Sequence, residues 1–221
     1  EAFGHRFMMD AVVPGGVAAD LPAGQADAIA RQCDLIELEL RRLRQVYDEH
    51  AGLQDRFMST GRVLPELALR LGLTGMAGRA SGQAHDLRCD QPWPPYDRLQ
   101  PRQAGRDTGD VAARVAVRFD EVFESLRLIR ELCAALPAGA VHTDPAAPAA
   151  DAFGAGWVEG WRGEVLVALE TSADGRIRRC HAHDPSWQNW PVLEHAIMGN
   201  IVPDFPLINK SFNLSYSGHD L

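Results

Sequence analysis

The chain has 221 residues, of which 46% are hydrophobic, and a formal net charge of −8. This length can bury one hydrophobic core, or one domain with a small appendage. The negative charge argues against a nucleic-acid partner bound through its phosphates. No apolar run reaches the roughly 18 residues that a membrane helix needs, so no direct membrane span is predicted.

Four cysteines are spread along the chain without a C-x-x-C spacing. Cys33 and Cys133 fall on apolar faces of predicted helices, where a small buried thiol is expected. This cysteine usage favours a reduced, cytosolic compartment. No signal peptide is recognisable, and the chain begins at Glu1 without a Met, so we expect a fragment of a longer protein.

Two segments have the apolar periodicity of long amphipathic helices. Residues 22–50 place apolar side chains at alternating steps of four and three, which forms one stripe on one helix face. Residues 108–136 repeat this pattern, with Thr108 or Asp107 as candidate N-caps. Helices of similar length with matching stripes are expected to pack lengthwise. The seam residues predicted to be buried are Ile36, Leu40, Val122 and Leu126.

Glycine and proline predict the shorter elements of the first half. Pro14-Gly15-Gly16 predicts a turn before the first long helix. A helix is expected over 64–71, because Pro65 suits a first-turn position and Gly72 suits the end of a helix.

Residues 78–97, between the two long helices, suit neither a helix nor a strand. Their glycines and prolines interrupt regular structure, yet they carry several charged and aromatic side chains. Ordered irregular backbone with dense charge is typical of functional sites. The alternative is a surface loop whose arginines and aspartates pair with each other. Its position in the sequence predicts that this segment caps one end of the helix pair.

The last third of the chain changes to strand-like periodicity. Residues 138–156 are rich in Pro, Ala and Gly, which predicts a linker. An apolar run over 164–170, the turn signal Asp174-Gly175 and an alternating pattern over 176–183 together predict a β-hairpin. The elements expected after it are a break at 185–190 and short helices over 191–198 and 204–212.

Together these elements predict a mainly α chain of the α+β class, with a helical bundle of long antiparallel helices and a small β-hairpin. The predicted organisation is a helical bundle over 1–137, a linker over 138–156, and a hairpin with short helices over 157–221.

Several short pieces, in a fixed order, resemble one protein family. The pieces are Gly4-His5-Arg6 before Pro14-Gly15-Gly16-Val17, Arg79-x-Ser81-Gly82-x-x-x-Asp86-Leu87-Arg88, Gln91-Pro92-Trp93 with Tyr96, Gly109-Asp110-x-x-x-Arg114, Glu159-x-x-Arg162-Gly163-Glu164, and Asp204 before an apolar turn. They resemble the large subunit of energy-converting, membrane-bound nickel–iron hydrogenases of the hydrogenase-3 or formate hydrogenlyase type. That subunit shares its fold with the 49-kDa subunit of NADH-quinone oxidoreductase. The resemblance covers nearly the whole chain, but only the C-terminal part of the family's subunit.

The resemblance implies a hydrogenase large-subunit-like fold that docks on an iron–sulfur small subunit near membrane-arm subunits. It implies a cytoplasmic position, peripheral on the inner face of the cytoplasmic membrane, with iron–sulfur clusters held by a partner subunit. The implied role is electron or proton coupling inside a membrane-associated oxidoreductase complex, with quinone as a candidate reactant.

In true hydrogenases of this family, two C-x-x-C pairs hold nickel and iron, because thiolates are soft, charged ligands. The resemblance places the second pair at Ser215 and Gly218, where neither residue offers a thiolate. The first pair would lie upstream of Glu1. We therefore expect a lost nickel–iron centre and no cofactor in this fragment. The alternatives are a non-catalytic scaffold that keeps only docking surfaces and, third, a working hydrogenase with unusual ligands.

Six charged residues are the candidate site residues: Arg79, Asp86, Arg88, Asp110, Arg114 and Arg162. Because buried charges need partners, one interpretation is a structural ion network. The other is a polar path for proton movement or for coupling to the membrane arm. The sequence does not separate the two, and no catalytic residue is assigned. His181-x-His183 is a possible chelate but lacks a third ligand for a metal site.

Overall fold

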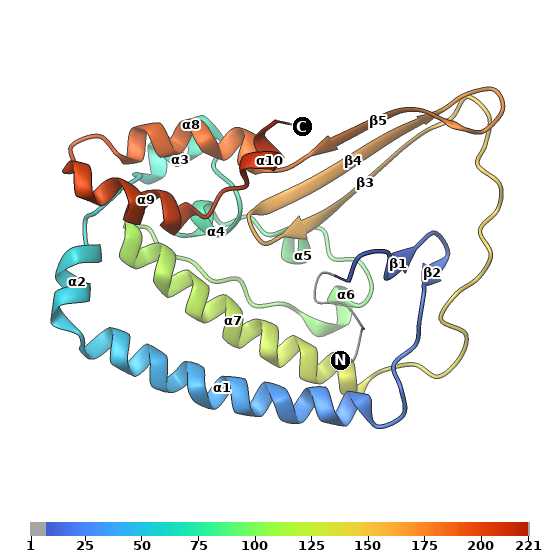
Figure 1. The fold of residues 1–221 in the computed structure, drawn as a ribbon, viewed down its shortest axis with the longest axis horizontal. Helices are drawn as coiled ribbons and strands as arrows, with labels where there is room; N and C mark the ends of the chain where they lie inside the picture. The colour runs from blue at the N-terminus through green and yellow to red at the C-terminus, as the bar shows by residue number, and fades with distance from the viewer. Residues whose placement is uncertain (1–7, 221) are drawn as a thin grey trace.

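A computed structural model describes residues 8–220 and shows an α+β fold (Figure 1). Two long helices lie along one side, short helices gather at one end, and a three-stranded sheet extends from the short helices toward the other end. The piece of family resemblance at residues 4–6 lies outside the described residues. None of the helices in the described part of the chain is both long enough and apolar enough to cross a bilayer.

The two long helices, α1 (Gln25–Glu49) and α7 (Val111–Ala134), run antiparallel and in contact, as predicted. Burial along their seam is only partly as predicted. Leu126 is 5% exposed and Leu40 is half-buried, whereas Ile36 and Val122 are 39% and 38% exposed. Because only these two helices are long within residues 8–220, the more specific prediction of a bundle of long helices is not confirmed.

Capping groups mark the start of α7 and the end of the short helix α3. Asp110 Oδ1 accepts a hydrogen bond from Ala113 N at 2.8 Å, so Asp110 caps α7 and the predicted caps Thr108 and Asp107 are wrong. A carboxylate there satisfies a free amide of the first turn and faces the positive end of the helix dipole. Helix α3 (Pro65–Leu71) is confirmed, with proline at its start and Gly72 in the left-handed region after it.

The prediction that segment 78–97 contains no helix is wrong. Helix α4 (Gly75–Arg79) enters it, and α5 (Leu87–Asp90) and α6 (Tyr96–Leu99) lie within or across its end. Helices of one turn are too short for apolar periodicity to reveal. Helix α2 (Ala51–Phe57) is another short helix of this half.

The segment also lies along the side of α7 instead of capping one end of the helix pair. Met76 and Ala80 form a buried apolar cluster with Ala113 and Val117 in the first half of α7. The prediction of a cap is therefore wrong. Arg79 and Asp86 of the segment are buried, whereas Asp90 and Asp97 are exposed.

The sheet has the antiparallel order β3-β4-β5, with β3 (Phe153–Gly160), β4 (Gly163–Thr171) and β5 (Ile177–His183). The β4–β5 hairpin confirms the prediction, and Ser172 N donates to Arg176 O at 2.8 Å across its turn.

Strand β3 corrects the predicted linker, because it begins inside residues 138–156. Gly154 and Gly156 give it no side chains at alternate positions, so the strand has no alternating apolar pattern to recognise. At the N-terminal end, β1 (Val12–Val13) and β2 (Gly16–Val17) pair across the predicted turn.

After the sheet come α8 (Ser186–Ala196), a 3-10 turn η1 (Val202–Asp204), α9 (Phe205–Phe212) and α10 (Tyr216–His219). Helix α9 is as predicted. The predicted break at 185–190 is wrong, because α8 begins there and contains Pro191.

The main core joins helices from both sides of the predicted linker. Its buried residues are Val63, Ala68, Leu73, Ala77, Val111, Val192, Leu193, Ala196, Ile208, Phe212 and Leu214. Helices α8 and α9 therefore pack directly on α3 and α7.

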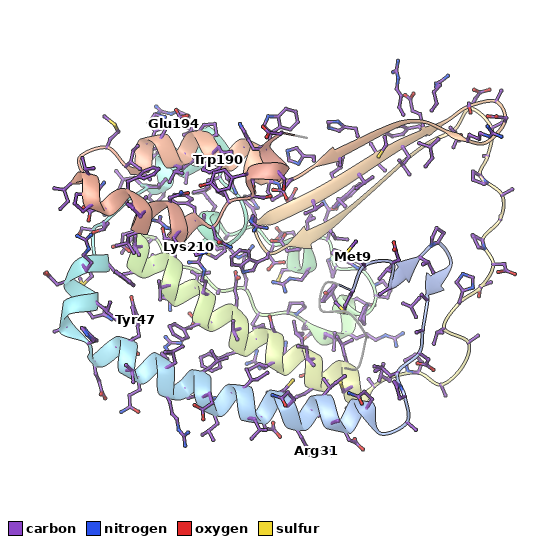
Figure 2. All side chains as sticks on the ribbon, viewed as in Figure 1. Met9, Arg31, Tyr47, Trp190, Glu194 and Lys210 are labelled. Carbon is purple, nitrogen blue, oxygen red and sulfur yellow. The ribbon has the colours of Figure 1, made fainter. Side chains whose placement is uncertain are left out.

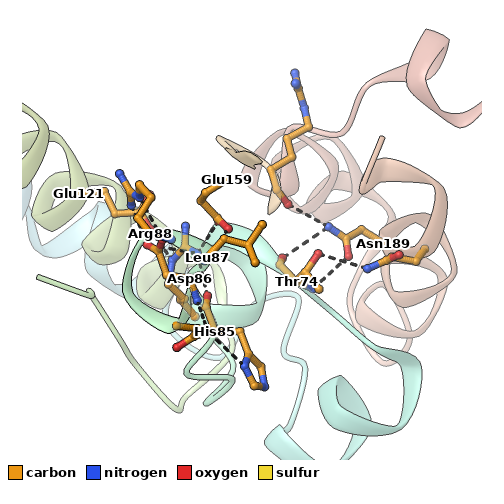
Figure 3. A network of polar contacts seen from close by, with 12 residues as sticks. Thr74, His85, Asp86, Leu87, Arg88, Glu121, Glu159 and Asn189 are labelled. Carbon is orange, nitrogen blue, oxygen red and sulfur yellow. Dashed lines mark hydrogen bonds and ion pairs between the residues drawn. The ribbon is translucent and has the colours of Figure 1, made fainter. Parts of the chain in front are cut away.

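Asn189 of α8 holds the start of α4 against the β3–β4 turn. Its Oδ1 accepts a hydrogen bond from Thr74 N at 3.2 Å, and its Nδ2 donates to Arg162 O at 3.3 Å (Figure 3). Gly75 has φ 64°, and a Cβ there would lie 2.0 Å from Arg162 O, so glycine is required for this approach. The packing brings Arg79, at the end of α4, next to β3.

Candidate functional site

Arg79 is the centre of a buried charge cluster that joins α4, α7 and β3. Figure 3 shows four other members of this cluster, Asp86, Arg88, Glu121 and Glu159. Its side chain is 2% exposed. Arg79 Nε donates to Glu121 Oε1 at 2.7 Å, and Nη1 donates to Glu159 Oε1 at 2.9 Å and to His85 O at 3.0 Å. Burial acts against the charged guanidinium, but the attraction of Glu121 and Glu159 outweighs it and raises the pKa of Arg79.

Asp86 and Arg88 form a two-point ion pair beside Arg79. Arg88 Nε donates to Asp86 Oδ1 at 2.9 Å and Nη2 donates to Oδ2 at 2.6 Å. Asp86 is 1% exposed, and Arg79 Nη1 lies 3.9 Å from its Oδ2. Burial alone would raise the pKa of Asp86, but the hydrogen bonds and charge of Arg88, with the charge of Arg79, hold this pKa below its usual value.

Glu159 is a carboxylate of the cluster whose pKa is raised. Its side chain is 4% exposed, and its Oε2 accepts a hydrogen bond from Leu87 N at 3.2 Å. Burial raises the pKa of Glu159 above its usual value, despite the opposing hydrogen bond from Arg79. The nearby negative charge of Asp86 raises it further. The cluster thus combines two arginines with three carboxylates, and the pKa of one of these, Glu159, is raised.

Arg114 belongs to a second cluster, at the start of α7. It is fully buried, and its three nitrogen atoms donate to Ser211 Oγ, Gly109 O and Gly61 O, each at 2.8 Å. Its guanidinium carbon lies 4.2 Å from the ring centroid of Phe212, a cation–π contact. Burial lowers the pKa of Arg114 to about 9, although the charge of Asp110 opposes this shift.

Asp110 is held by backbone donors at the same place. Besides capping α7, its Oδ2 accepts a hydrogen bond from Ser59 N at 2.8 Å. Asp110 is 7% exposed and forms no ion pair within 4.0 Å among residues 8–220. Asp110 therefore joins the turn that follows α2 to the start of α7.

Arg162 lies apart from both clusters, on the β3–β4 turn. Its Nε donates to Asn213 O at 2.5 Å, and its guanidinium carbon lies 5.1 Å from the ring centroid of Trp161. The six predicted residues therefore occupy three places: Arg79, Asp86 and Arg88 share one, Asp110 and Arg114 share another, and Arg162 contacts the chain near the tail.

Three further charged residues were missed by the sequence reasoning: Arg118, Glu121 and Glu159. Arg118 and Glu121 follow Arg114 at four and seven residues on α7, which places all three on one helix face. This spacing was a usable signal. Glu159 stands in one of the motif pieces, but its partner Arg79 is 80 residues away, so no local pattern links them.

The tail positions of the expected second cysteine pair are used in another way. Ser215 caps α10, where its Oγ accepts a hydrogen bond from Gly218 N at 3.0 Å. Gly218 is buried, and a Cβ there would lie 2.6 Å from Asp184 Cγ. The side chain of Asp184 thus fills the space into which a thiol at 218 would project. These residues do not fit a pair of thiolate ligands.

Within residues 8–220 no group of three or more His, Cys, Asp or Glu side chains is placed to hold a metal ion. His181 and His183 both lie beside the ring of Trp187, with centroids 6.3 and 5.8 Å from it. Their surroundings are aromatic, and no third ligand is placed beside them among the described residues.

Comparisons with known proteins agree on one group of relatives. A family model described as the 49 Kd subunit of respiratory-chain NADH dehydrogenase matches residues 1–154. A carbon monoxide-induced hydrogenase of Rhodospirillum rubrum is 32% identical over 96% of this chain. An NADH-quinone oxidoreductase subunit of Paramagnetospirillum magneticum is 29% identical over 91%, and formate hydrogenlyase subunit 5 of Escherichia coli is 30% identical over 93%.

The fold has a solved relative in the membrane-bound sulfane sulfur reductase, an archaeal respiratory membrane complex. A chain of that complex superimposes with a TM-score of 0.86, at 26% identity over 95% of the present chain. The present chain spans 59%, 58% and 36% of the lengths of the three sequence relatives, in the order given, and 59% of the structural one. The resemblance read from the motifs is thereby confirmed. The chain belongs to the family of the 49-kDa subunit of respiratory-chain NADH dehydrogenase, which also has hydrogenase subunits among its relatives.

Proposed function

We propose that this chain is part of a hydrogenase-like large subunit of a membrane-associated oxidoreductase complex, where it couples electron transfer to a membrane arm without a nickel–iron centre. The family and the names of the relatives support the first half of this proposal. Ser215 and Gly218, near the end of the chain, support the second half, which is the absence of a nickel–iron centre.

The arrangement around Gly218 is the observation that supports the proposed loss of the metal centre. A nickel–iron site between two cysteine pairs needs thiolates from both pairs. Here one position is a serine whose hydroxyl caps α10, and the other is a glycine packed against Asp184. A serine hydroxyl ionises far above neutral pH and is a hard ligand, so it is a poor substitute for a thiolate.

The proposed partners are an iron–sulfur small subunit, which would hold the iron–sulfur clusters, and membrane-arm subunits. The proposed location is cytoplasmic, peripheral on the inner face of the cytoplasmic membrane. Support comes from the relatives, one of which is described as part of a respiratory membrane complex.

The metal content of the full-length protein tests the proposal. The protein is to be purified with its complex from a host that matures hydrogenases, and nickel and iron are measured by elemental analysis. We expect nickel far below one atom per subunit, with iron retained by a co-purified iron–sulfur subunit. Nickel near one atom per subunit would overturn the proposal. A nickel-containing hydrogenase large subunit from the same host serves as the control for loading.

In this proposal the Arg79 cluster contributes a protonatable group to the coupling. Glu159 is buried, lies in a cluster with an excess of carboxylates, and has a raised pKa. Substituting Glu159→Gln keeps an acceptor for Arg79 but removes the proton-binding carboxylate. We expect the variant complex to transfer electrons with reduced proton movement per electron in membrane vesicles.

A non-catalytic scaffold is the second candidate, and one observation favours it: Arg79, Asp86 and Arg88 direct their ion pairs within the chain. For a scaffold, Glu159→Gln changes only the free energy of unfolding. Unchanged proton movement, at unchanged assembly of the complex, would therefore favour the scaffold.

A further inference from the structure

A cleft of about 420 Å³ lies where α2, α7, α9 and the β3–β4 turn meet, away from the Arg79 cluster. This volume is in the range of about 300–1,000 Å³ that small-molecule sites have. The lining of the cleft is mostly apolar and includes a few polar groups. The lining residues are Phe57, Val111, Val115, Arg118, Trp161, Leu207, Lys210, Ser211 and Asn213.

The charged residues of this lining are both cations. Arg118 Nη2 donates to Ser211 O at 2.5 Å, and its guanidinium carbon lies 5.5 Å from the ring centroid of Trp161. Lys210 is exposed, and its Nζ lies 3.4 Å from Asn213 Oδ1, a long contact. No carboxylate lines the cleft among the described residues.

Two more arginines lie directly behind this lining. Arg114 donates to Ser211 Oγ, and Arg162 donates to Asn213 O. The positive charge of Arg118 adds to burial in lowering the pKa of Arg114, because like charges repel. The lowered pKa of Arg118 has burial as its main cause.

Two carboxylates outside the lining act on these arginines: the charge of Asp110 favours the charged form of Arg114, and that of Glu121 favours the charged form of Arg118, but burial has the larger effect on both pKa values. Asp110 caps α7 and accepts a hydrogen bond from Ser59 N, and Glu121 accepts the hydrogen bond of Arg79 Nε. Four cations, Arg114, Arg118, Arg162 and Lys210, thus outnumber these two carboxylates, and the surroundings of the cleft are positive in a chain whose net charge is −8. Clefts lined by one sign of charge attract ligands of the other sign.

Lys210 is the only lysine of the sequence, because every other member of the 22 Lys and Arg residues is an arginine. It lies on α9, which packs against α7 (Figure 2). A lysine ammonium is a compact, mobile donor that can follow a ligand, whereas an arginine fork has a fixed geometry.

We infer that this cleft binds a small amphipathic anion, with an alkyl or aromatic body and one carboxylate or phosphate group. The body would contact Val115, Trp161 and Leu207, and the anionic group would bind between Arg118 and Lys210. The two cations of the lining suit a group with one or two negative charges, such as a carboxylate or a phosphate monoester.

Reactivity of the Lys210 amine gives a direct test in the purified full-length protein. Acetylation by an N-hydroxysuccinimide ester is followed at Lys210 by mass spectrometry, with the α-amino group as internal reference. We expect decanoate and decyl phosphate to slow acetylation of Lys210 at least about fivefold, the effect of an ion pair worth about 1 kcal/mol. The uncharged decanamide, and acetate without an apolar body, are expected to leave the rate unchanged.

Two variants show whether the anion binds at these cations. By calorimetry, Lys210→Gln and Arg118→Gln are each expected to weaken decanoate binding at least about fivefold. The matched control is Arg31→Gln, which removes an exposed cation of α1 far from the cleft (Figure 2). Arg118→Gln also removes a hydrogen bond to α9. If the Arg118→Gln variant does not fold, the Lys210→Gln variant alone decides the outcome.

Lipid vesicles distinguish the two possible sources of the anion, a lipid headgroup and a free anion. Protection of Lys210 by phosphatidylcholine vesicles that contain phosphatidic acid indicates a lipid headgroup, and protection by soluble decanoate alone indicates a free anion. Both results support the inference. Equal protection by decanoate and decanamide, or no protection by either, would overturn it. Protection that exists only in the assembled complex and ignores decanoate would also overturn it, and would assign the cleft to a protein partner.

Discussion

At the scale of single residues, Asp86 and Arg79 are ionised side chains that water scarcely reaches, with 1% and 2% exposure. A buried charge is tolerated only when nearby groups replace the water that it has lost. Asp86 accepts two hydrogen bonds from the side chain of Arg88, and Arg79 donates hydrogen bonds to two carboxylates. Removing one partner therefore leaves the other charge buried and unpaired, which costs more than the pair itself contributes.

Substituting Arg88→Ala tests this cost. The variant leaves Asp86 with Arg79 at 3.9 Å as its nearest cation, so we expect the free energy of unfolding to fall by more than about 1 kcal/mol, toward the 3–5 kcal/mol typical of broken buried pairs. Thermal or chemical denaturation of the full-length protein measures it. Arg42→Ala, which breaks the exposed Arg42–Glu39 pair, is the control and should change stability little. Equal effects of the two substitutions would contradict a buried network.

The depressed pKa of Asp86 predicts a dependence of stability on pH. Its ionised form is favoured by folding, so its contribution is complete above its ordinary pKa of about 3.9 and is lost as pH falls through the lower pKa of the folded state. The free-energy difference between the protein and an Asp86→Asn variant should be constant from about pH 7 to 5 and shrink below about pH 4.

For Glu159, the dependence of stability on pH should have the opposite sign. Its folded pKa is raised, so its contribution is present below its ordinary pKa of about 4.3 and is lost as pH rises through the folded pKa. A Glu159→Gln variant should therefore gain stability relative to the protein as pH rises. The same slope for both variants would show that the two carboxylates are not in the environments described.

At the scale of elements, the junction of β5, α8 and α10 shows how the tail is built. Asp184 Oδ1 accepts a hydrogen bond from Ser186 N at the start of α8, and its side chain occupies the space next to Gly218 of α10. Ser215 N donates to Ser186 Oγ at 2.9 Å. The tail is thus anchored by packing and hydrogen bonds between protein groups.

Substituting Gly218→Ala tests this junction. The added Cβ would lie 2.6 Å from Asp184 Cγ, and overpacking of this kind costs about 1–3 kcal/mol. Denaturation should show this loss in the single variant and a smaller loss when Asp184→Ala is already present. The double-mutant cycle separates the contact with residue 218 from the hydrogen bond that Asp184 accepts from Ser186 N. Additive effects would show that Asp184 does not fill the space beside residue 218.

At the scale of the whole molecule, the sequence located the site segment but not its partners. The pattern from Arg79 to Arg88 pointed to the segment that carries the buried cluster. Glu121 and Glu159 lie 42 and 80 residues from Arg79, so only the fold brings them together. The long helices were predictable because periodicity over many turns is a strong signal, whereas one-turn helices and the glycine-rich β3 carry no periodic signal.

The fold also separates the six candidate residues that the sequence grouped into one possible polar path. Arg114 is buried because α9 places Phe212 and Ser211 over it, and α9 is nearly a hundred residues later in the chain. Arg162 is directed toward Asn213 by the tight β3–β4 turn. Sequence spacing cannot report either placement, because both arise from packing between distant elements.

The central claim is that a member of this family performs its role in a complex without a nickel–iron centre. Exchange between H₂ and D₂O reports such a centre directly, because it needs hydrogen activation but no electron partner. The full-length protein, purified with its complex, is to be measured by mass spectrometry for HD, beside an active hydrogenase of the family from the same host. We predict HD formation no faster than in buffer alone. Exchange at a rate comparable to that of the active hydrogenase would contradict the account.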